Sequence, residues 1–286
     1  MVTPFASDGA LDLNGASDLA QFLVREGSEG LVVAGSTGEG SSLSDDEKME
    51  LFSCVAQAVS VPVLAGSTFA DTARSVALTS RVADTGVAGV LATTPAYARP
   101  SQAGLAAHLG AVAESTALPV MLYDVPARTG RRLDPATTLE VRRLHPNVVA
   151  LKDASGDVAG AAHLKAAAGD DFALYSGDDA NVLAFMAVGA VGLVSVAAHW
   201  AGPQLRALIE AVHANEWARA REINEQLYES YRFESSELYP NPMPAKAALR
   251  EVGQRVGECR LPHGQGDAPL ARAAAEVVAA LRGVRG

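Results

Sequence analysis

Two side chains that could do carbonyl chemistry stand where strand-like apolar runs end. Lys152 follows residues 148–151, and Tyr123 closes the run that starts at residue 119. Burial at a strand end would lower the pKa of an amine, because removal from water disfavours its charged form. A neutral amine can attack a carbonyl carbon to form an imine, and a nearby phenol can move protons as the imine forms and breaks. The pair therefore predicts imine chemistry on a carbonyl substrate.

The same two residues also have structural interpretations. Lys152 could pair with an acid at the rim of the fold, such as Asp153 or Asp179. Tyr123 could be a core tyrosine whose hydroxyl is satisfied by a neighbour, which is the commoner role of a single buried tyrosine. The residues alone leave both alternatives open.

Lysine is scarce in this chain, which has four lysines among 23 basic residues. Lys48 and Lys165 lie in polar, helical surroundings that predict solvent-exposed side chains. Lys246 follows Pro244 in a segment that fits either a surface or an interface. Lys152 is thus the lysine whose position calls for a chemical explanation.

Further polar groups follow the other strand-like runs. They include Ser36, Thr37, Ser67, Thr68, Tyr97, Asp178, Asp179 and Ser195. Residues 35–42 predict a tight turn whose backbone N–H groups can hold a carboxylate, because the Gly-Lys-Ser/Thr ending of a phosphate loop is missing. Adjacent acids at 178 and 179 are expected to cap a helix, and no His, Cys or carboxylate cluster has the spacing of a metal site. Arg128 would offer a planar fork to a substrate carboxylate, although a surface ion pair is the commoner role of a single arginine.

The elements that must position these groups repeat along the chain as a short apolar run, a polar loop and a longer helical segment. The runs begin at Leu31, Val61, Val87, Pro119, Val148, Phe172 and Gly192. Their starts are about twenty to thirty residues apart, and runs that are apolar on both faces are typical of parallel strands covered by helices. The repeat, without a Gly-x-Gly-x-x-Gly turn, predicts an α/β fold of the (β/α)8 barrel type, in which strand ends converge on one mouth.

The two ends of the chain depart from this repeat. Only Met1 and Val2 precede Thr3-Pro4, so the first strand of the barrel is expected to be truncated. After residue 213 the strands stop, and helices are expected at 216–232, 244–252 and 270–282. We therefore expect a barrel catalytic domain over residues 1–214 and a helical domain over residues 215–286.

The composition excludes several classes of protein. A net charge of −10 without a basic stripe argues against nucleic-acid binding. Two cysteines cannot build a disulfide framework, and the N-terminus lacks the basic start and apolar core of a signal peptide, so a cytoplasmic location is expected. Residues 180–205 carry no charge, but glycines and Gly202-Pro203 interrupt them, which favours buried elements over a membrane span.

Seven short motifs follow one another over nearly the whole chain. They are Val2-Thr-Pro-Phe, Gly35-Ser-Thr-Gly-Glu, Thr94-Pro-Ala-Tyr-Ala-Arg-Pro-Ser, Tyr123-Asp-Val-Pro-Ala-Arg-Thr-Gly, Leu151-Lys-Asp-Ala-Ser-Gly-Asp, Ser176-Gly-Asp-Asp and Gly192-Leu-Val-Ser-Val. Each is weak alone, but their order and spacing resemble the dihydrodipicolinate synthase and N-acetylneuraminate lyase family of class I aldolases. The resemblance implies a (β/α)8 barrel with a C-terminal helical domain, a homotetramer built from two tight dimers, and no cofactor beyond a covalent imine with pyruvate.

The resemblance also implies catalytic roles. Lys152 matches the lysine that forms the imine with the keto group of pyruvate, and Tyr123 matches the proton donor and acceptor beside it. Ser36 and Tyr97 match the other hydroxyls of a proton relay, with Tyr97 supplied by the neighbouring subunit. Ser36 stands where threonine is more usual in the family but keeps the hydroxyl.

Four further residues match substrate-binding positions of the family. Thr37, Gly177 and the backbone at Val194 correspond to the pyruvate site. Arg128 corresponds to the arginine with which the synthases hold the carboxylate of aspartate semialdehyde, and the lyases and sugar-acid aldolases usually lack it. The resemblance thus implies small-molecule substrates, with no nucleic-acid or membrane partner.

The expected reaction is the condensation of pyruvate with L-aspartate semialdehyde to 4-hydroxy-tetrahydrodipicolinate, a lyase step in lysine and diaminopimelate biosynthesis. A first alternative is a paralogous pyruvate-dependent lyase or aldolase that acts on a sugar acid or another aldehyde. A second alternative, of a different class, is a non-catalytic barrel that binds a keto acid. The second is disfavoured by the presence of both Lys152 and Tyr123.

Some positions depart from the family pattern. Asp124 stands where many members have asparagine. At the positions that bind lysine in feedback-sensitive synthases, Asp45 replaces a histidine, Ala70 an amide-bearing residue, Arg74 an acid and Ala96 an aromatic residue. An arginine that faces a lysine ligand repels it, so we expect an enzyme insensitive to lysine.

Overall fold

The computed structural model describes residues 1–283. Two compact units share these residues: Pro62–Ser195 form one unit, and Met1–Val61 form the other with the chain from Val196 onward. We describe each unit by itself.

The unit Pro62–Ser195 is built on a parallel sheet. Its strands are β2 (Val63–Gly66), β3 (Gly89–Thr93), β4 (Val120–Asp124), β5 (Val148–Asp153), β6 (Ala173–Ser176) and β7 (Gly192–Leu193). They pair in chain order, each with the next. Most of their side chains are buried, as expected for parallel strands with both faces covered. The carboxyl ends of β4 and β5 therefore lie side by side.

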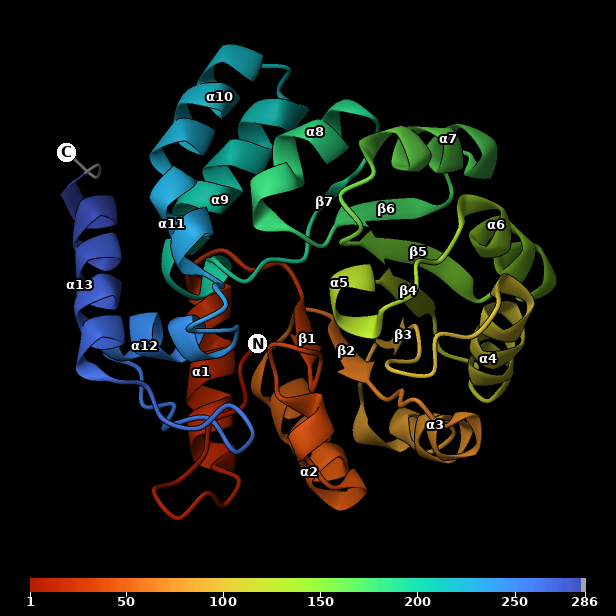
Figure 1. Cartoon of the computed structure of the whole chain (residues 1–286), viewed down its shortest axis with the longest axis horizontal. Helices are drawn as coiled ribbons and strands as arrows, with labels where there is room; N and C mark the ends of the chain where they lie inside the picture. The colour runs from red at the N-terminus through yellow and green to blue at the C-terminus, as the bar shows by residue number, and fades with distance from the viewer. Residues whose placement is uncertain (284–286) are drawn as a thin grey trace. The chain divides into compact units, whose positions relative to one another are not determined.

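Helices follow the strands of this unit. They are α3 (Thr72–Thr79), α4 (Gln102–Glu114), α5 (Pro126–Thr129), α6 (Pro135–Leu144), α7 (Val158–Ala168) and α8 (Val182–Ala187), with 3-10 turns η2 (Val82–Thr85) and η3 (Asp179–Asn181). In Figure 1, α3, α4, α6 and α7 follow one another along the outer side of the curved sheet. Side-chain oxygens of Asp71, Ser101 and Asp157 accept backbone N–H bonds and begin α3, α4 and α7.

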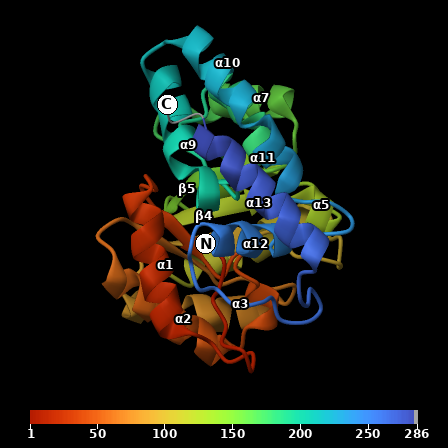
Figure 2. The same ribbon diagram turned by 90° about the vertical axis from the view of Figure 1, so that its left-hand side faces the viewer.

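The second unit is mostly helical. It holds α1 (Leu13–Arg25), β1 (Leu31–Val33), η1 (Gly40–Ser42), α2 (Asp45–Ala58), α9 (Ala198–His213), α10 (Trp217–Gln226), α11 (Tyr228–Phe233), α12 (Met243–Glu251) and α13 (Ala268–Gly283). Figure 2 shows α13 running beside α11 and α12, which it contacts. These C-terminal helices pack around Met243, Ala247, Cys259, Leu270 and Ala274.

The strands agree closely with the sequence-based expectation. Each of the seven apolar runs contains a strand, although β7 is only two residues long. No strand precedes β1 within residues 1–283. The first residues are held within their unit, since the Val2 N–H donates to His199 Nε2 at 3.0 Å and the Thr3 hydroxyl donates to the Gly38 carbonyl at 2.6 Å.

The helices differ in detail from the expectation. Ser44 begins α2 with a capping box to Glu47, as its sequence predicts. The segment 72–85 forms α3 and the 3-10 turn η2 with a break at Ser80, whose hydroxyl donates to the Ala77 carbonyl at 3.0 Å and competes with the helical ladder. The segment 216–232 forms the two helices α10 and α11. None of the described helices combines the length and apolar character needed to cross a bilayer.

Candidate active site

Lys152 and Tyr123 are neighbours across the β4–β5 pairing. The two residues are register partners near the carboxyl ends of their strands. The Lys152 Nζ lies 4.2 Å from the centroid of the Tyr123 ring. Tyr123 is buried and Lys152 is half-buried. Parallel pairing in register therefore places an amine against a phenol at one edge of the sheet.

Neither structural interpretation of this pair fits the described residues. Lys152 forms no ion pair with Asp153 or Asp179: the Asp153 Oδ1 accepts the Ser155 N–H at 2.8 Å, and the Asp179 Oδ1 accepts the Ser195 hydroxyl. Within residues 1–283 the Tyr123 hydroxyl makes no hydrogen bond with the protein, so it is not a satisfied core group. Both groups remain available to a substrate.

Two buried carboxyls follow this pair along the strands. Asp124 and Asp153 are the next register partners along β4 and β5. Burial raises the pKa of Asp124 to about 7, and the Asp153 charge adds to this shift, while the Leu133 N–H at 3.0 Å and the charge of Arg132 oppose it. Burial also raises the pKa of Asp153, against hydrogen bonds from Ser155. In the sequence, Asp124 stands out only as a departure from the family pattern.

Gly177 gives the Lys152 side chain its room. A Cβ atom at Gly177 would lie 3.0 Å from the Lys152 Cγ and 3.1 Å from its Cε, closer than carbon atoms pack. Gly177 also donates its N–H to the Asp153 carbonyl at 2.7 Å, which continues the pairing of β5 and β6. The backbone at this position therefore forms a wall along the lysine stem.

We expect Gly177→Ala to move the Lys152 amine and to lower the rate of imine formation. A displacement of about 1 Å at a reacting group can cost up to about a hundredfold in rate, so a ten- to hundredfold loss is expected. Borohydride trapping of [14C]pyruvate, followed over time, measures this step. Gly192→Ala is the matched control, because a Cβ at Gly192 would make only ordinary contact with the Tyr175 ring, at 3.5 Å, and its backbone is not in the left-handed region. An unchanged trapping rate in Gly177→Ala would show that the Lys152 side chain can accommodate the added methyl group without displacing its amine.

Tyr97 lies on the loop after β3 and is not brought to Lys152 within this chain. Its side chain is 96% exposed, and its φ is +68°. The Ala98 N–H donates to the Ala96 carbonyl at 2.8 Å, which closes a γ-turn around Tyr97. The same loop is tied to the segment after α5 by the Arg131 guanidinium, which donates to the Arg99 carbonyl at 3.1 Å. The loop thus presents the phenol outward.

Arg128 and Val194 follow the carboxyl ends of β4 and β7 in the same unit. Arg128 is exposed on the short helix α5, which begins at Pro126 and ends at Gly130 with a φ of +72°. The Val194 N–H donates to the Ser176 carbonyl at 2.8 Å, so this donor is already used in the pairing that follows β6. Of the adjacent acids, Asp178 caps the Ala180 N–H as predicted. Asp179 lies in the first turn of η3, is fully buried and accepts the Ser195 hydroxyl.

Ser36 and Thr37 lie on a tight turn in the other unit. The Gly40 N–H donates to the Gly35 carbonyl at 3.1 Å, and the Glu39 N–H donates to the Ser36 carbonyl at 3.1 Å. A Cβ at Gly40 would lie 2.1 Å from the Ala34 carbonyl oxygen, so only glycine fits there. The Ser36 hydroxyl makes no hydrogen bond with the described residues, whereas the Thr37 hydroxyl accepts the Asn241 Nδ2–H at 2.7 Å.

Glu39, at the end of this turn, is fully buried in an ion pair. Its Oε1 lies 2.7 Å from the Lys246 Nζ, and its Oε2 accepts the Arg260 N–H at 2.8 Å. Burial lowers the pKa of Lys246, although the Glu39 carboxylate opposes the shift. Lys246 also donates to the Glu258 carbonyl at 2.9 Å. The sequence had not identified Glu39, Lys246 or Asn241 as parts of this turn's support.

The structure corrects the expected exposure of the other three lysines. Lys48 is only 1% exposed on α2, because its helix face packs inward despite the acidic residues around it. Lys246 lies in the interior and not at a surface. Lys165 is half-buried, and its Nζ donates to the carbonyls of Gly169 and Phe172.

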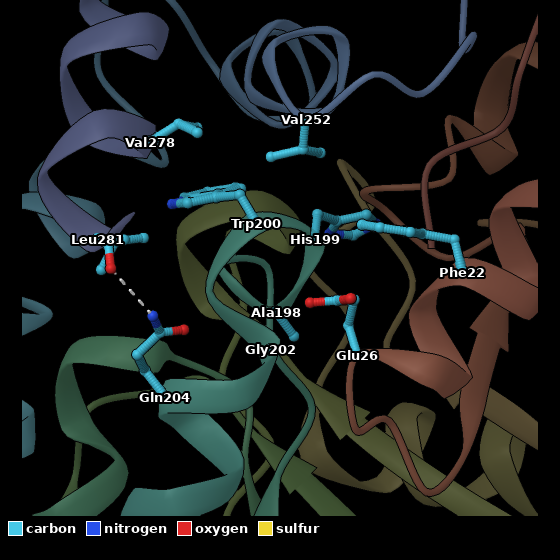
Figure 3. A pocket seen from close by; sticks show the side chains of 10 residues that line it. All are labelled: Phe22, Glu26, Ala198, His199, Trp200, Gly202, Gln204, Val252, Val278 and Leu281. Carbon is cyan, nitrogen blue, oxygen red and sulfur yellow. Dashed lines mark hydrogen bonds between the residues drawn. The ribbon is translucent and has the colours of Figure 1, made fainter. Parts of the chain in front are cut away.

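A pocket elsewhere contains none of the predicted catalytic residues. It has a volume of about 170 Å³ and lies in the mainly helical unit, where Figure 3 shows side chains from α1, α9 and α13 around it. Its lining residues are Phe22, Glu26, Ala198, His199, Trp200, Gly202, Gln204, Val252, Val278 and Leu281. Within residues 1–283, no group of three or more His, Cys, Asp or Glu side chains is arranged to hold a metal ion.

Comparisons with known proteins identify the same family as the seven sequence motifs. The model of the dihydrodipicolinate synthetase family matches residues 1–280. The 4-hydroxy-tetrahydrodipicolinate synthase of Symbiobacterium thermophilum is 46% identical over 92% of this chain and 89% of its own length. The enzyme of the same name from Synechococcus elongatus is 43% identical over 98% of this chain and 92% of its own length.

Solved structures agree over the same length. A dihydrodipicolinate synthase from Bacillus anthracis superposes with a TM-score of 0.93 and 38% identity, covering 98% of this chain and 95% of that one. The Cyanidioschyzon merolae enzyme with lysine bound gives a TM-score of 0.95 at 37% identity, over 99% and 96% of the two chains. The predicted barrel fold with its C-terminal helices is confirmed by these matches, as is the predicted resemblance.

Proposed function

The chain belongs to the dihydrodipicolinate synthetase family, and from this premise we propose that it condenses pyruvate with L-aspartate semialdehyde to 4-hydroxy-tetrahydrodipicolinate. The observation that carries the proposal is the Lys152 amine held 4.2 Å from the Tyr123 ring at the strand ends. An amine beside a phenol suits imine formation and its proton transfers, and within the described residues the amine has no ion pair and the phenol hydroxyl no hydrogen bond. The relatives' shared name supports the choice of reaction.

The proposed reaction begins at Lys152. Its neutral amine attacks the keto carbon of pyruvate, and loss of water gives the imine. Loss of a proton from the methyl group gives an enamine, whose carbon attacks the aldehyde of the semialdehyde. The amino group of that substrate then attacks the imine carbon, closes the ring and releases Lys152. Tyr123 donates and accepts the protons that these steps move, in a relay with Ser36 and with Tyr97 from a neighbouring subunit.

The remaining residues bind the two substrates in this proposal. Thr37, Gly177 and the Val194 backbone hold pyruvate, and Arg128 holds the carboxylate of the semialdehyde. The exposed phenol of Tyr97, presented outward on a γ-turn, supports a role in another subunit's site. We accordingly propose a homotetramer built as a dimer of dimers, a cytoplasmic location, no cofactor beyond the imine itself, and a catalytic domain over residues 1–214 followed by a helical domain over residues 215–286.

A coupled assay with pyruvate and aspartate semialdehyde tests the proposal. Turnover of the semialdehyde well above that of sugar-acid aldehydes is the expected result. A preference for another aldehyde would favour the paralogous lyase or aldolase. Borohydride treatment with pyruvate alone distinguishes either enzyme, the synthase or the paralogue, from a non-catalytic barrel, which would form no covalent adduct.

We expect Arg128→Ala to weaken binding of the semialdehyde while leaving the pyruvate step intact. Loss of charge-assisted hydrogen bonds to a carboxylate costs about 1.5–3 kcal/mol, or roughly a ten- to hundredfold rise in the KM of the semialdehyde. The pyruvate trapping rate should not change. Arg143→Ala, an exposed arginine on α6, is the matched control. Unchanged turnover in Arg128→Ala would remove the reason for preferring the synthase.

We expect turnover to be insensitive to lysine. The guanidinium of Arg74, a residue of α3, packs 3.7 Å from the centroid of the Phe69 ring, and its charge would repel the ammonium of a lysine ligand. Initial rates measured against rising lysine concentration check this expectation. Inhibition at low millimolar lysine or below would contradict it, and inhibition that appeared only in Arg74→Glu would support the electrostatic explanation.

A further inference from the structure

The turn that carries Ser36 and Thr37 is held by a segment more than two hundred positions away in the same unit. The Asn241 Nδ2–H donates to the Thr37 Oγ1 at 2.7 Å, across 204 positions. Asn241 is only 5% exposed. Two residues beyond Thr37, Glu39 bonds the Lys246 ammonium and the Arg260 N–H. The turn is therefore fixed at two points by residues 241–260.

The contact at Thr37 constrains the direction of its hydroxyl proton. A threonine hydroxyl has one proton to donate and two lone pairs that accept. An amide N–H that points at the oxygen occupies one lone pair and cannot receive the proton. The proton is then left for another acceptor, and a carboxylate oxygen is the strongest acceptor a keto-acid substrate offers.

We propose that Asn241 is a positioning residue that fixes the Thr37 hydroxyl as a hydrogen-bond donor to the substrate carboxylate. The proposal rests on the proposed function, in which Thr37 binds pyruvate. Asn241 acts through Thr37 and has no contact with substrate in this scheme. The Glu39 ion pair keeps the turn in place, so that one amide can set the direction of one proton.

The anchoring of Asn241 supports this role. Its own N–H donates to the Ser235 hydroxyl at 3.4 Å, and its side chain lies just before α12, the helix that carries Lys246. Lys246 meets the Phe5 ring at 4.4 Å and the Glu258 carbonyl at 2.9 Å, so this part of α12 is held on several sides. Asn241 therefore lies in a turn that is tied to Ser235 and that leads directly into the anchored helix α12.

The test exchanges the donor for an acceptor of the same shape. In Asn241→Asp, a carboxylate takes the Thr37 proton and turns the oxygen lone pair toward the substrate. The readout is the pyruvate concentration that gives half-maximal borohydride trapping. We expect it to rise roughly tenfold or more, the scale of one lost hydrogen bond to a charged group. Asn241→Ala, which leaves the hydroxyl able to rotate, should give a smaller rise.

Repeating both substitutions in a Thr37→Val background separates positioning from added charge. If Asn241 acts through the hydroxyl, neither substitution should change trapping further once that hydroxyl is gone. Asn224→Asp is the charge control, because it adds a carboxylate in the same unit and keeps the oxygen that accepts from Tyr231. Thermal unfolding of each variant identifies any loss of fold. If Asn241→Asp does not fold, Asn241→Ala is compared with and without Thr37→Val, and this comparison alone decides the question.

Two results would overturn the proposal. One is wild-type trapping in both Asn241 variants; the other is an effect of equal size with and without the Thr37 hydroxyl. Failure of the proposed function looks different, because then the wild-type chain itself would trap no pyruvate. Trapping of pyruvate without use of the semialdehyde would leave the role of Asn241 fully testable.

Discussion

Replacing Lys152 by arginine is expected to abolish the borohydride-stable adduct with pyruvate and to lower turnover by about a thousandfold or more. Removal of the group that forms the covalent intermediate usually lowers the turnover rate by this factor or more. Arginine keeps the positive charge and can stack on the Tyr123 ring as the lysine does, so the fold should survive. A guanidinium cannot lose its proton in a protein, and it therefore cannot serve as the nucleophile.

The scarcity of lysine makes this experiment easy to interpret. Mass spectrometry of the trapped protein has only four lysines to consider, and two of the other three, Lys48 and Lys246, are 1% exposed. Lys165→Arg is the matched control, because Lys165 donates to two backbone carbonyls that an arginine can also reach. An adduct that persisted in Lys152→Arg, or one on another lysine, would refute the proposed nucleophile.

The features that the sequence predicts best depend on neighbours along the chain. The apolar run 148–151 predicts a buried strand, and parallel strands bring their carboxyl ends to one edge. The side-by-side placement of Lys152 and Tyr123 followed from those two facts alone. Capping at Ser44 was predicted for the same reason, since the capping box lies within four consecutive residues.

Burial set by distant contacts could not be predicted in this way. Lys48 lies among acidic residues that suggest a solvated helix, yet the packing of its helix buries it. Glu39 and Arg260 are bonded across 221 positions, and nothing near either residue indicates the other. At the break after Thr79 the Ser80 hydroxyl bonds the Ala77 carbonyl, a contact that local helical spacing does not reveal.

We expect Lys246→Met to destabilise the protein by about 3–5 kcal/mol, the usual result of removing one partner of a buried ion pair. Methionine fills similar space but leaves the Glu39 carboxylate, which is fully buried, without the ammonium at 2.7 Å. The Arg260 N–H remains as a donor to its second oxygen. Chemical denaturation, read by circular dichroism, measures the free energy of unfolding.

The double variant Glu39→Gln with Lys246→Met distinguishes a stranded charge from a lost contact. If the cost is the unpaired carboxylate, the neutral pair should recover much of the stability, because a glutamine can still accept the Arg260 N–H. Arg232→Met is the matched control, since Arg232 and Glu229 form an ion pair that is 65% exposed on both sides and should contribute little. A double variant no more stable than Lys246→Met would instead mean that Lys246 stabilises α12 through the Glu258 carbonyl and the Phe5 ring.

The Glu39–Lys246 ion pair lies at the end of the turn that carries Ser36 and Thr37. We therefore also expect Lys246→Met to weaken pyruvate trapping at temperatures where the variant is still folded, whereas Arg232→Met should not.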